Sequence, residues 1–452
     1  MAQYNINSYY LNDLDKLYQF LVPAGSHSLR MKLPRPYGRD IFSPRFVGNG
    51  ISPKRKTLRF DPRLNRGVSR RGMKNDQIES REKFDYIILD NIIGDVSDVQ
   101  NFLSRVKNLC RQNSRLIVIY YNHLWEPILK LASFFGLRRK VGEQNWLDNQ
   151  DLANLLDLAG FESITTQKRL LLPIYIPFLS NLLNKWLANL PLINSFCLVT
   201  FIIARPKARN GKECSVSIIV PTRNEELNVP RIIPSIPKFG TRQEIIFVEG
   251  HSKDETWKAI EKEVLRKNPE HIKVRAYRQR GKGKADAVRL GFSKASGEVL
   301  MILDADLTVD PKELKKFYAA LISGTGDFAN GCRLVYPMES QAMQTLNKIG
   351  NQIFSWLFTW ILGQHFKDTL CGTKALFKKD YEKITLDKDY ENLDPFGDFG
   401  LIFGAVKNNL KIVEIPVRYK ERLHGKTNIT RFRHGIMLLM VTILAFKKFK
   451  AW

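Results

Sequence analysis

Apolar runs separated by helix-like and polar stretches divide the chain into two successive α/β series. In the first series, short apolar runs predict buried strands, and an apolar period of three to four residues predicts helices. We expect strands over 84–90, 115–121, 161–167 and 196–204, and helices over 98–110, 125–135 and 150–159. In the second series, runs of branched apolar residues predict central parallel strands at 215–220, 244–248 and 298–303. Alternating strands and helices indicate the α/β fold class in both series.

The stretches between these elements set the expected domain boundaries. Residues 205–214 are polar and contain Pro206 and Gly211, which is typical of a linker. Residues 28–76 have neither helical nor strand periodicity. The sequence therefore predicts six parts: an N-terminal helical segment (1–27), a basic, disordered segment (28–76), an incomplete α/β domain (77–204), a linker (205–214), a second α/β domain (215–435) and an amphipathic C-terminal helix (436–452).

The positive charge of the chain is concentrated in two places. The 452 residues include 71 Lys and Arg against 45 Asp and Glu, a net charge of +26. Residues 28–76 hold 14 basic and three acidic residues, and residues 411–452 hold ten and two. Such an excess indicates an anionic partner: nucleic acid, a membrane surface or a phosphorylated substrate. For 28–76 we weigh a nucleic-acid-binding arm against a degraded, disordered stretch, and favour the second because no aromatic stacking pattern accompanies the charge.

The apolar stretches are too short or too interrupted for a membrane span, which takes about 20 apolar residues. Leu170–Ile203 is apolar but contains three prolines. The tail 436–452 combines apolar residues with Lys447, Lys448 and Trp452, which is typical either of an interfacial helix or of a helix packed on its own domain. Five scattered cysteines without CxxC spacing suit a reducing cytoplasm. We therefore predict a peripheral protein at the cytoplasmic face of a membrane.

Polar and acidic residues follow three of the predicted parallel strands, at 221–226, 249–256 and 304–306. Because ligands of open α/β sheets bind outside the carboxyl ends of the strands, we expect these segments to form one site. Asp304 and Asp306 flank a single residue and can reach one cation. Mg²⁺ or Mn²⁺, held by one or two carboxylates and by phosphate oxygens, suits such a pair.

Four motifs, in order, carry a resemblance to a known family. They are Pro-Thr-x-Asn-Glu from Pro221, Val-Glu-Gly-x-Ser-x-Asp-x-Thr from Val248, Gly-Lys-Gly-Lys-Ala from Gly281, and Asp-Ala-Asp-Leu from Asp304. With these motifs, residues 215–430 resemble family-two glycosyltransferases with the GT-A fold, and among them the dolichyl- or polyprenyl-phosphate sugar synthases. The resemblance implies a single, inverting, metal-dependent transfer from a nucleotide sugar donor to a lipid phosphate or a glycan acceptor.

The resemblance also implies the residues that bind the donor. Those expected to line the base and ribose pocket are Pro221, Thr222, Arg223 and Glu225. Glu249 and Gly250 stand where the family usually has an Asp-Asp pair, which leaves the nucleotide base open. Lys282 and Ala285 would flank the nucleotide, and Asp304 and Asp306 would hold the metal on the diphosphate, where it neutralises charge on the departing nucleoside diphosphate.

On the acceptor side, the resemblance implies that Arg333, Arg422 and Lys426 meet the lipid phosphate, since a guanidinium fits phosphate oxygens well. For any single arginine, the alternative is a solvated surface charge. Asp398 could act as the general base for a hydroxyl acceptor, whereas a phosphate acceptor is already ionised and needs no base. A structural or helix-capping role for Asp398 is the alternative.

The first series is similar to the second half of a class I S-adenosylmethionine-dependent methyltransferase, in its order of strands, helices and closing strands over 84–204. That family places its cofactor at an acidic, glycine-rich turn after its first strand. Residues 21–25 resemble the approach to this turn, but the basic segment 28–76 then follows. We therefore expect an incomplete Rossmann-like domain that does not bind S-adenosylmethionine. The competing hypotheses are a nucleic-acid-binding protein and a bifunctional methyltransferase–glycosyltransferase; we expect no nucleic-acid partner.

Overall fold

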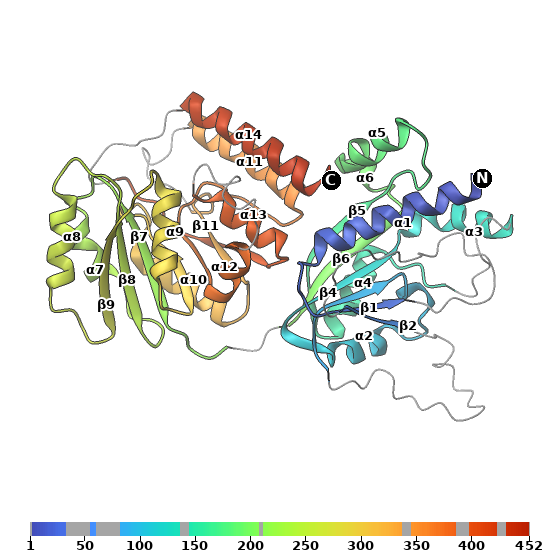
Figure 1. Ribbon diagram of the computed structural model, residues 1–452, viewed down its shortest axis with the longest axis horizontal. Coiled ribbons are helices and arrows are strands. Elements are labelled where there is room, and N and C mark those ends of the chain that lie inside the picture. Colours follow the sequence, from blue (N-terminus) through green and yellow to red (C-terminus); the bar gives the residue numbers. More distant parts are fainter. Residues whose placement is uncertain are drawn as a thin grey trace. The chain divides into compact units, whose positions relative to one another are not determined.

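Two separate β-sheets organise the chain into two units (Figure 1). The computed structural model describes residues 2–32, 55–59, 82–135, 144–207, 211–336, 345–385, 397–422 and 431–451. Unit 1 comprises Met1–Lys207 with Lys450–Trp452, and unit 2 comprises Ala208–Phe449. The boundary falls inside the predicted linker, but the last strand of unit 1 takes the first two linker residues, because Arg205 pairs with Glu162 (Nη2–Oε2 2.9 Å).

Unit 1 is built on a six-stranded sheet with the order β2-β1-β3-β4-β6-β5. The pairs β2–β1, β1–β3 and β3–β4 are parallel, and β4–β6 and β6–β5 are antiparallel. The strands are β1 (Ser28–Lys32), β2 (Arg55–Arg59), β3 (Phe84–Asp90), β4 (Cys110–Tyr121), β5 (Phe161–Arg169) and β6 (Val199–Pro206). The helices are α1 (Ala2–Leu21), α2 (Val99–Lys107), α3 (Glu126–Phe134), α4 (Asn149–Leu158), α5 (Leu179–Lys185) and α6 (Pro191–Asn194), with the short 3-10 helices η3 (Ile93–Asp95), η4 (His123–Trp125) and η5 (Leu187–Asn189).

Alternation along the strands gives this sheet two apolar faces. In β3, Ile87 and Leu89 pack with α2 and α4, whereas Tyr86 and Ile88 pack with α1. Successive side chains of a strand point to opposite faces of the sheet, so a strand that is covered on both sides is apolar at nearly every position. The expected strand 84–90 is confirmed with the same bounds, and the expected helices and the other strands occur with ends shifted by a few residues.

The structure corrects the prediction for 28–76, because two parallel strands, β1 and β2, lie within it. Leu29 and Met31 are buried in β1, and Arg30 is buried between them because its guanidinium pairs with Asp90 (Nη2–Oδ2 2.6 Å). Leu29 and Met31 alternate with polar residues over only five positions, a pattern too short to predict a strand within a basic stretch. Residues 33–54 and 60–76 of the predicted segment lie outside the described residues.

Unit 2 contains a seven-stranded mixed sheet with the order β13-β11-β12-β10-β7-β8-β9. Strand β12 is antiparallel to both neighbours, and the other pairs are parallel. The strands are β7 (Val216–Thr222), β8 (Gln243–Glu249), β9 (Ile272–Arg278), β10 (Val299–Ile302), β11 (Phe328–Cys332), β12 (Lys374–Phe377) and β13 (Ile412–Pro416). The helices are α7 (Val229–Ser235), α8 (Thr256–Leu265), α9 (Lys284–Lys294), α10 (Leu314–Ile322), α11 (Thr345–Leu362), α12 (Lys378–Thr385), α13 (Phe399–Lys407) and α14 (Arg431–Phe449), with the 3-10 helix η6 (Pro311–Glu313).

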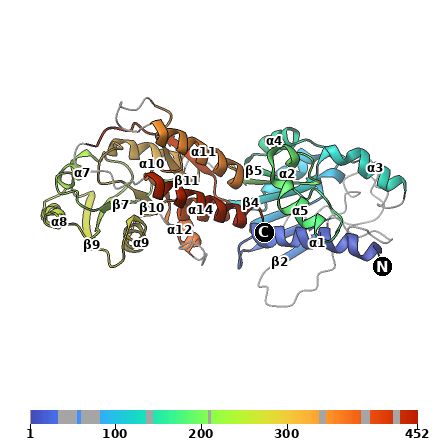
Figure 2. The same ribbon diagram turned by 90° about the horizontal axis from the view of Figure 1, so that it is seen from above.

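Helix α14 packs beside α11, and both views show the two helices side by side (Figures 1 and 2). The rings of Trp360 and Phe446 lie 5.4 Å apart, and Leu438 and Val441 are buried. Ile436 and Met440, on the other side of α14, are exposed. One face of α14 therefore packs on unit 2, as the second interpretation of the tail predicts, and a second apolar face is open; the interfacial interpretation stays a prediction. The helix starts at Arg431, before the predicted 436. None of the described helices combines the length and the hydropathy needed to cross a bilayer.

Candidate active site

The carboxyl ends of β7, β8 and β10 lie at one edge of the unit 2 sheet, as the sequence predicts. A non-glycine residue with positive φ follows each strand: Asn224 (φ 56°), His251 (φ 58°) and Leu307 (φ 56°). The first two loops are bonded together, since Asn224 N donates to Ser252 Oγ (3.0 Å) and Lys253 N donates to Asn224 Oδ1 (2.8 Å). Such backbone conformations are uncommon outside glycine and occur often at functional sites.

The predicted donor-binding residues of β7 and β8 lie along this edge. Glu225 accepts a hydrogen bond from Asn228 Nδ2 (2.6 Å), and burial raises the pKa of Glu225. Glu249 is buried and accepts from Ser252 N (2.5 Å), so its carboxylate shapes its own loop. The hydroxyl of Thr222 donates to Val220 O (2.8 Å). Of the others, Pro221 is half-buried and Arg223 is exposed, and Gly250 donates its N–H to Thr222 O (2.9 Å).

Asp304 pairs with Lys284, the first residue of α9, with 2.7 Å between Oδ1 and Nζ. Burial alone would raise the pKa of Asp304, but Lys284, helped by Lys374, outweighs burial and the pKa is lowered. Lys284 responds in the opposite direction: burial opposes its charge, yet Asp304 and Asp398 raise its pKa. Gly372 leaves room for this pair, because a Cβ there would lie 2.2 Å from both Asp304 Oδ2 and Lys284 Nζ.

From the glycine-lysine motif the sequence prediction named Lys282 and Ala285, as residues that flank the nucleotide, and it did not single out Lys284. Lys282 is exposed, and Ala285 is half-buried with its backbone against Gly397. Lys284 is the residue that reaches the carboxylates. The available signal was its position directly after Gly283, whose φ of +88° ends the loop and starts the helix.

Asp306 lies beside a residue predicted for the acceptor side. Its Oδ2 is 2.5 Å from Arg422 Nη2, and its Oδ1 accepts from Thr308 Oγ1 (2.8 Å). Among the described residues, no three His, Cys, Asp or Glu side chains converge as a complete metal cage. The donor chemistry still fits Mg²⁺ or Mn²⁺, because two carboxylates from one strand end can share such an ion with phosphate oxygens.

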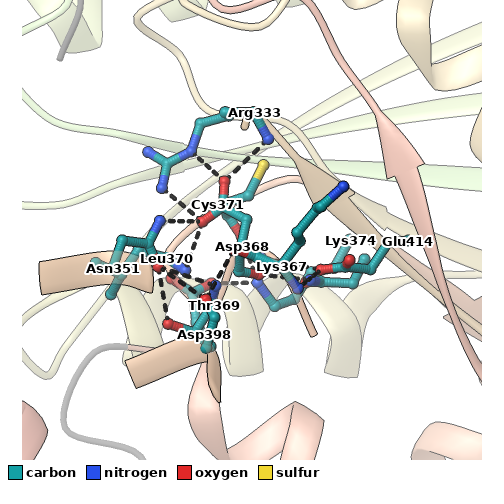
Figure 3. A network of polar contacts seen from close by, with 12 residues as sticks. Arg333, Asn351, Lys367, Asp368, Thr369, Leu370, Cys371, Lys374, Asp398 and Glu414 are labelled. Carbon is teal, nitrogen blue, oxygen red and sulfur yellow. Dashed lines mark hydrogen bonds and ion pairs between the residues drawn. The ribbon is translucent and has the colours of Figure 1, made fainter. Parts of the chain in front are cut away.

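Arg333 is held in a buried network around Asp368 (Figure 3). Its Nε and Nη2 atoms donate to the two Asp368 oxygens at 2.7 and 2.8 Å, and its backbone N–H donates to the same carboxylate (3.0 Å). Asn351 Nδ2 adds a further bond of 2.9 Å. Arg333 outweighs the effect of burial and lowers the pKa of Asp368 to about 2. The fork of Arg333 thus faces a carboxylate of the same chain, which the sequence prediction did not anticipate.

Asp398 immediately precedes α13 but makes no side-chain capping hydrogen bond, so the structure does not support the capping alternative. Its Oδ1 lies 3.3 Å from Nζ of the buried Lys374 and 3.9 Å from Nζ of Lys284. Lys284 thus links Asp304 and Asp398, which the sequence placed on the donor and acceptor sides. Lys426 lies outside the described residues.

Unit 2 is thus an α/β unit with an acidic site at the carboxyl ends of its parallel strands. Residues 217–385 match the family model described as Glycosyl transferase family 2, so unit 2 contains a domain of this family. The match and the mixed sheet together support the expected GT-A fold for this unit.

Relatives and solved structures cover about half of the chain. It is 31% identical over 235 residues to the dolichol-phosphate mannosyltransferase of Pyrococcus furiosus, a match covering 50% of this chain and 63% of that protein. It is 26% identical over 219 residues to the polyprenol monophosphomannose synthase of Mycolicibacterium smegmatis, covering 47% and 80%. A solved structure, glucosyl-3-phosphoglycerate synthase from Mycobacterium tuberculosis with uridine diphosphate, aligns with a TM-score of 0.37 and 15% identity over 52% of this chain and 80% of that one. The chain thus spans less than two thirds of the Pyrococcus relative.

Proposed function

We propose that unit 2 transfers one sugar, with inversion, from a nucleotide sugar to a polyprenyl phosphate. The observation that carries this proposal is the pair of aspartates at the end of β10. Asp304 pairs with Lys284, and Asp306 pairs with Arg422. The family 2 match and the names of the relatives agree with it.

In this proposal Asp304 and Asp306 hold Mg²⁺ or Mn²⁺, which supplies charge neutralisation for the leaving nucleoside diphosphate. Lys284 keeps Asp304 ionised and oriented, because the two groups lie 2.7 Å apart. Arg422 must leave Asp306 as donor and metal bind, and its guanidinium is then available for a phosphate. Pro221, Thr222, Arg223, Glu225, Glu249, Gly250, Lys282 and Ala285 remain the candidates for the donor pocket.

For the acceptor phosphate we propose Arg422 and Lys426 as contacts. Arg333 acts instead through Asp368, since two of its N–H groups and its backbone N–H are bonded to that carboxylate. The Asp398 carboxylate contacts two lysines and makes no helix-capping hydrogen bond. We therefore propose that its negative charge stabilises the charged form of these lysines in the site. An ionised phosphate needs no general base, whereas a glycan hydroxyl would make Asp398 the candidate base.

We also propose a peripheral membrane position at the cytoplasmic face, using the open apolar face of α14. For unit 1, we propose a methyltransferase-type domain without cofactor binding; its support is a sheet whose strands are parallel except β6, which is antiparallel to its neighbours β4 and β5.

The test is to incubate the full chain with a panel of nucleotide sugars, Mg²⁺ or Mn²⁺, and a polyprenyl phosphate, and to measure nucleoside diphosphate release and sugar-lipid formation together. We expect one donor to give both products in equal amounts, with both lost on adding a chelator. Release without sugar-lipid product would reject the lipid acceptor, and no release from any donor would reject the transferase proposal.

A further inference from the structure

The connection between β5 and β6 in unit 1 has polar side chains inside and apolar side chains outside. We call residues 171–196, which contain α5, η5 and α6, the β5–β6 segment. Ser180 is fully buried, and its hydroxyl donates to Ile174 O (2.7 Å) while accepting from Ile176 N (2.7 Å). The interior of this segment is therefore closed by hydrogen bonds rather than by an apolar core.

Two asparagines complete this polar interior. Asn184 bonds both backbone groups of Leu172, with Nδ2 donating to its carbonyl and Oδ1 accepting from its N–H at 2.8 Å each. Asn194 Nδ2 donates to Ala188 O (2.7 Å) and to Lys168 O (3.0 Å). Each asparagine thus fixes one half of the segment.

Large apolar side chains cover the outside of the same segment. Phe178 is 90% exposed and Leu192 is 84% exposed, and Tyr175, Leu182, Trp186 and Phe196 are exposed as well. Soluble monomers rarely expose a contiguous apolar surface of this kind, and such surfaces mark contacts with membranes or other molecules. Phe178 also has a positive φ of 61°, which is unusual for a residue with a β-carbon.

The segment is bonded to the body of unit 1. Asn184 Nδ2 donates to Tyr9 Oη of α1 (3.1 Å), and the rings of Tyr9 and Tyr175 lie 5.6 Å apart. At its other end, Trp125 Nε1 donates to Phe196 O (2.7 Å). This bond joins the segment to η4, directly before α3, in which Leu131 and Phe134 are exposed. The apolar surface is therefore positioned by specific bonds.

Charge and composition indicate which partner fits. Residues 168–196 contain no Asp or Glu, and Lys185 is exposed within the segment. Aromatic and aliphatic side chains with an exposed lysine and no carboxylate among them suit the interface of a bilayer that contains anionic lipids. The helices of the segment are short and interrupted by proline, and none of the described helices is suited to crossing a membrane. The contact would therefore be superficial.

We propose that the β5–β6 segment docks unit 1 on the surface of an anionic lipid bilayer. The segment belongs to unit 1 and α14 to unit 2, and the inference does not rest on the transferase proposal.

The experiment measures partition of the full chain into phosphatidylcholine vesicles with and without phosphatidylglycerol. Because α14 can bind on its own, the background carries Leu439→Ser and Met440→Ser. Adding Phe178→Ser and Leu192→Ser should weaken partition into anionic vesicles at least about tenfold. The matched control is Leu158→Ser on α4, a leucine that is 66% exposed outside the segment, and it should leave partition unchanged.

Unchanged partition in the Phe178→Ser, Leu192→Ser chain would overturn the proposal, as would equal binding to neutral and anionic vesicles. Sedimentation of the unsubstituted chain without lipid tests the rival occupant: a dimer that these two substitutions dissociate would assign the surface to a second copy and overturn the bilayer proposal. Circular dichroism should be unchanged, since both residues are exposed. Nucleoside diphosphate release with a short-chain, water-soluble acceptor should persist, which separates this test from that of the transferase proposal.

Discussion

Both units place an aspartate at the end of a buried parallel strand, but the two aspartates have different access to solvent. In unit 1, Asp90 pairs with Arg30, their side chains are 9% and 10% exposed, and the Arg30 guanidinium lies 3.8 Å from the centre of the Tyr18 ring. In unit 2, Asp304 and Lys284 are 30% and 28% exposed. The same sheet edge therefore carries a closed ion pair in one unit and an accessible pair in the other.

This difference separates a structural ion pair from a binding site. A buried pair stays together, because removing one partner leaves the other charged and without solvent. An accessible pair is stabilised by much less, because water screens both charges. A metal cation can therefore compete for Asp304 and a phosphate for Lys284, whereas Asp90 is committed to Arg30.

The largest effect that we expect is loss of transfer in Asp306→Asn. The substitution removes a charge from the proposed metal site, and several kcal/mol of transition-state stabilisation should go with it. We expect nucleoside diphosphate release to fall at least about 1000-fold, or about 4 kcal/mol. The control is Asp310→Asn, which changes a nearby carboxylate that pairs with Lys420 and caps η6, and which should retain activity. Unchanged turnover in Asp306→Asn would remove the metal assignment.

Asp90→Asn tests the closed pair in unit 1. It removes the carboxylate that lies 2.6 Å from the buried Arg30 guanidinium, while Asp15 remains 3.7 Å away. We expect unit 1 to lose roughly 3 kcal/mol of unfolding free energy, with sugar transfer unaffected. Hydrogen exchange of the β3 and β4 amides measures this loss within unit 1. Asp98→Asn is the control, because asparagine also caps a helix and the change should stay within about 0.5 kcal/mol. Equal effects of the two substitutions would contradict the contrast between the units.

The stability of unit 2 should depend on pH through Asp368. Its folded-state pKa of about 2 lies below the usual value for aspartate, so its carboxylate stabilises the fold fully above about pH 4. This contribution disappears as pH falls from about 4 to 2, and we expect a loss of roughly 2 kcal/mol in unit 2 over that window. Asp368→Asn should be less stable at pH 7 and should show a flatter acid response. Hydrogen exchange of the β12 amides measures both, and an unchanged acid slope in the variant would exclude Asp368 as the group responsible.

The difference between the two units depends on which charged residues pair, and the sequence could predict only part of this. Strands and strand ends followed from apolar runs, and Asp304 and Asp306 followed from their place after β10. The partners of these aspartates did not, because Lys284 and Arg422 reach them from distant parts of the chain. Arg30 looked like part of a basic, disordered segment because its neutralising partner is 60 positions away. Pairing across the fold decides whether a charge marks a ligand site, and periodicity does not contain that information.

Gly372→Ala tests the space beside Asp304 with a smaller effect. The new Cβ would lie 2.2 Å from both members of the Asp304–Lys284 pair and must displace one of them. We expect transfer to fall about tenfold, a change of about 1.4 kcal/mol in the activation barrier. Gly350→Ala on α11 is the control, since nothing lies within 4 Å of its Cβ and alanine favours helix. Unaltered kcat and KM in Gly372→Ala would show that the pair tolerates displacement.

The smallest expected effect is no effect at all: titration of the full chain with S-adenosylmethionine should release no heat of binding. The carboxylate that ends β3 is engaged by Arg30, and Asn91, the next residue, donates to Tyr10 Oη (3.3 Å), so the polar groups at this strand end bond within unit 1. Asp90→Asn serves as the internal test, because opening the pair should not create binding either. Binding at micromolar concentration by the unsubstituted chain would mean that the closed pair coexists with a cofactor site. Unit 1 would then be an active methyltransferase domain, and the contrast between a closed and an accessible sheet edge would no longer separate a structural unit from a catalytic one.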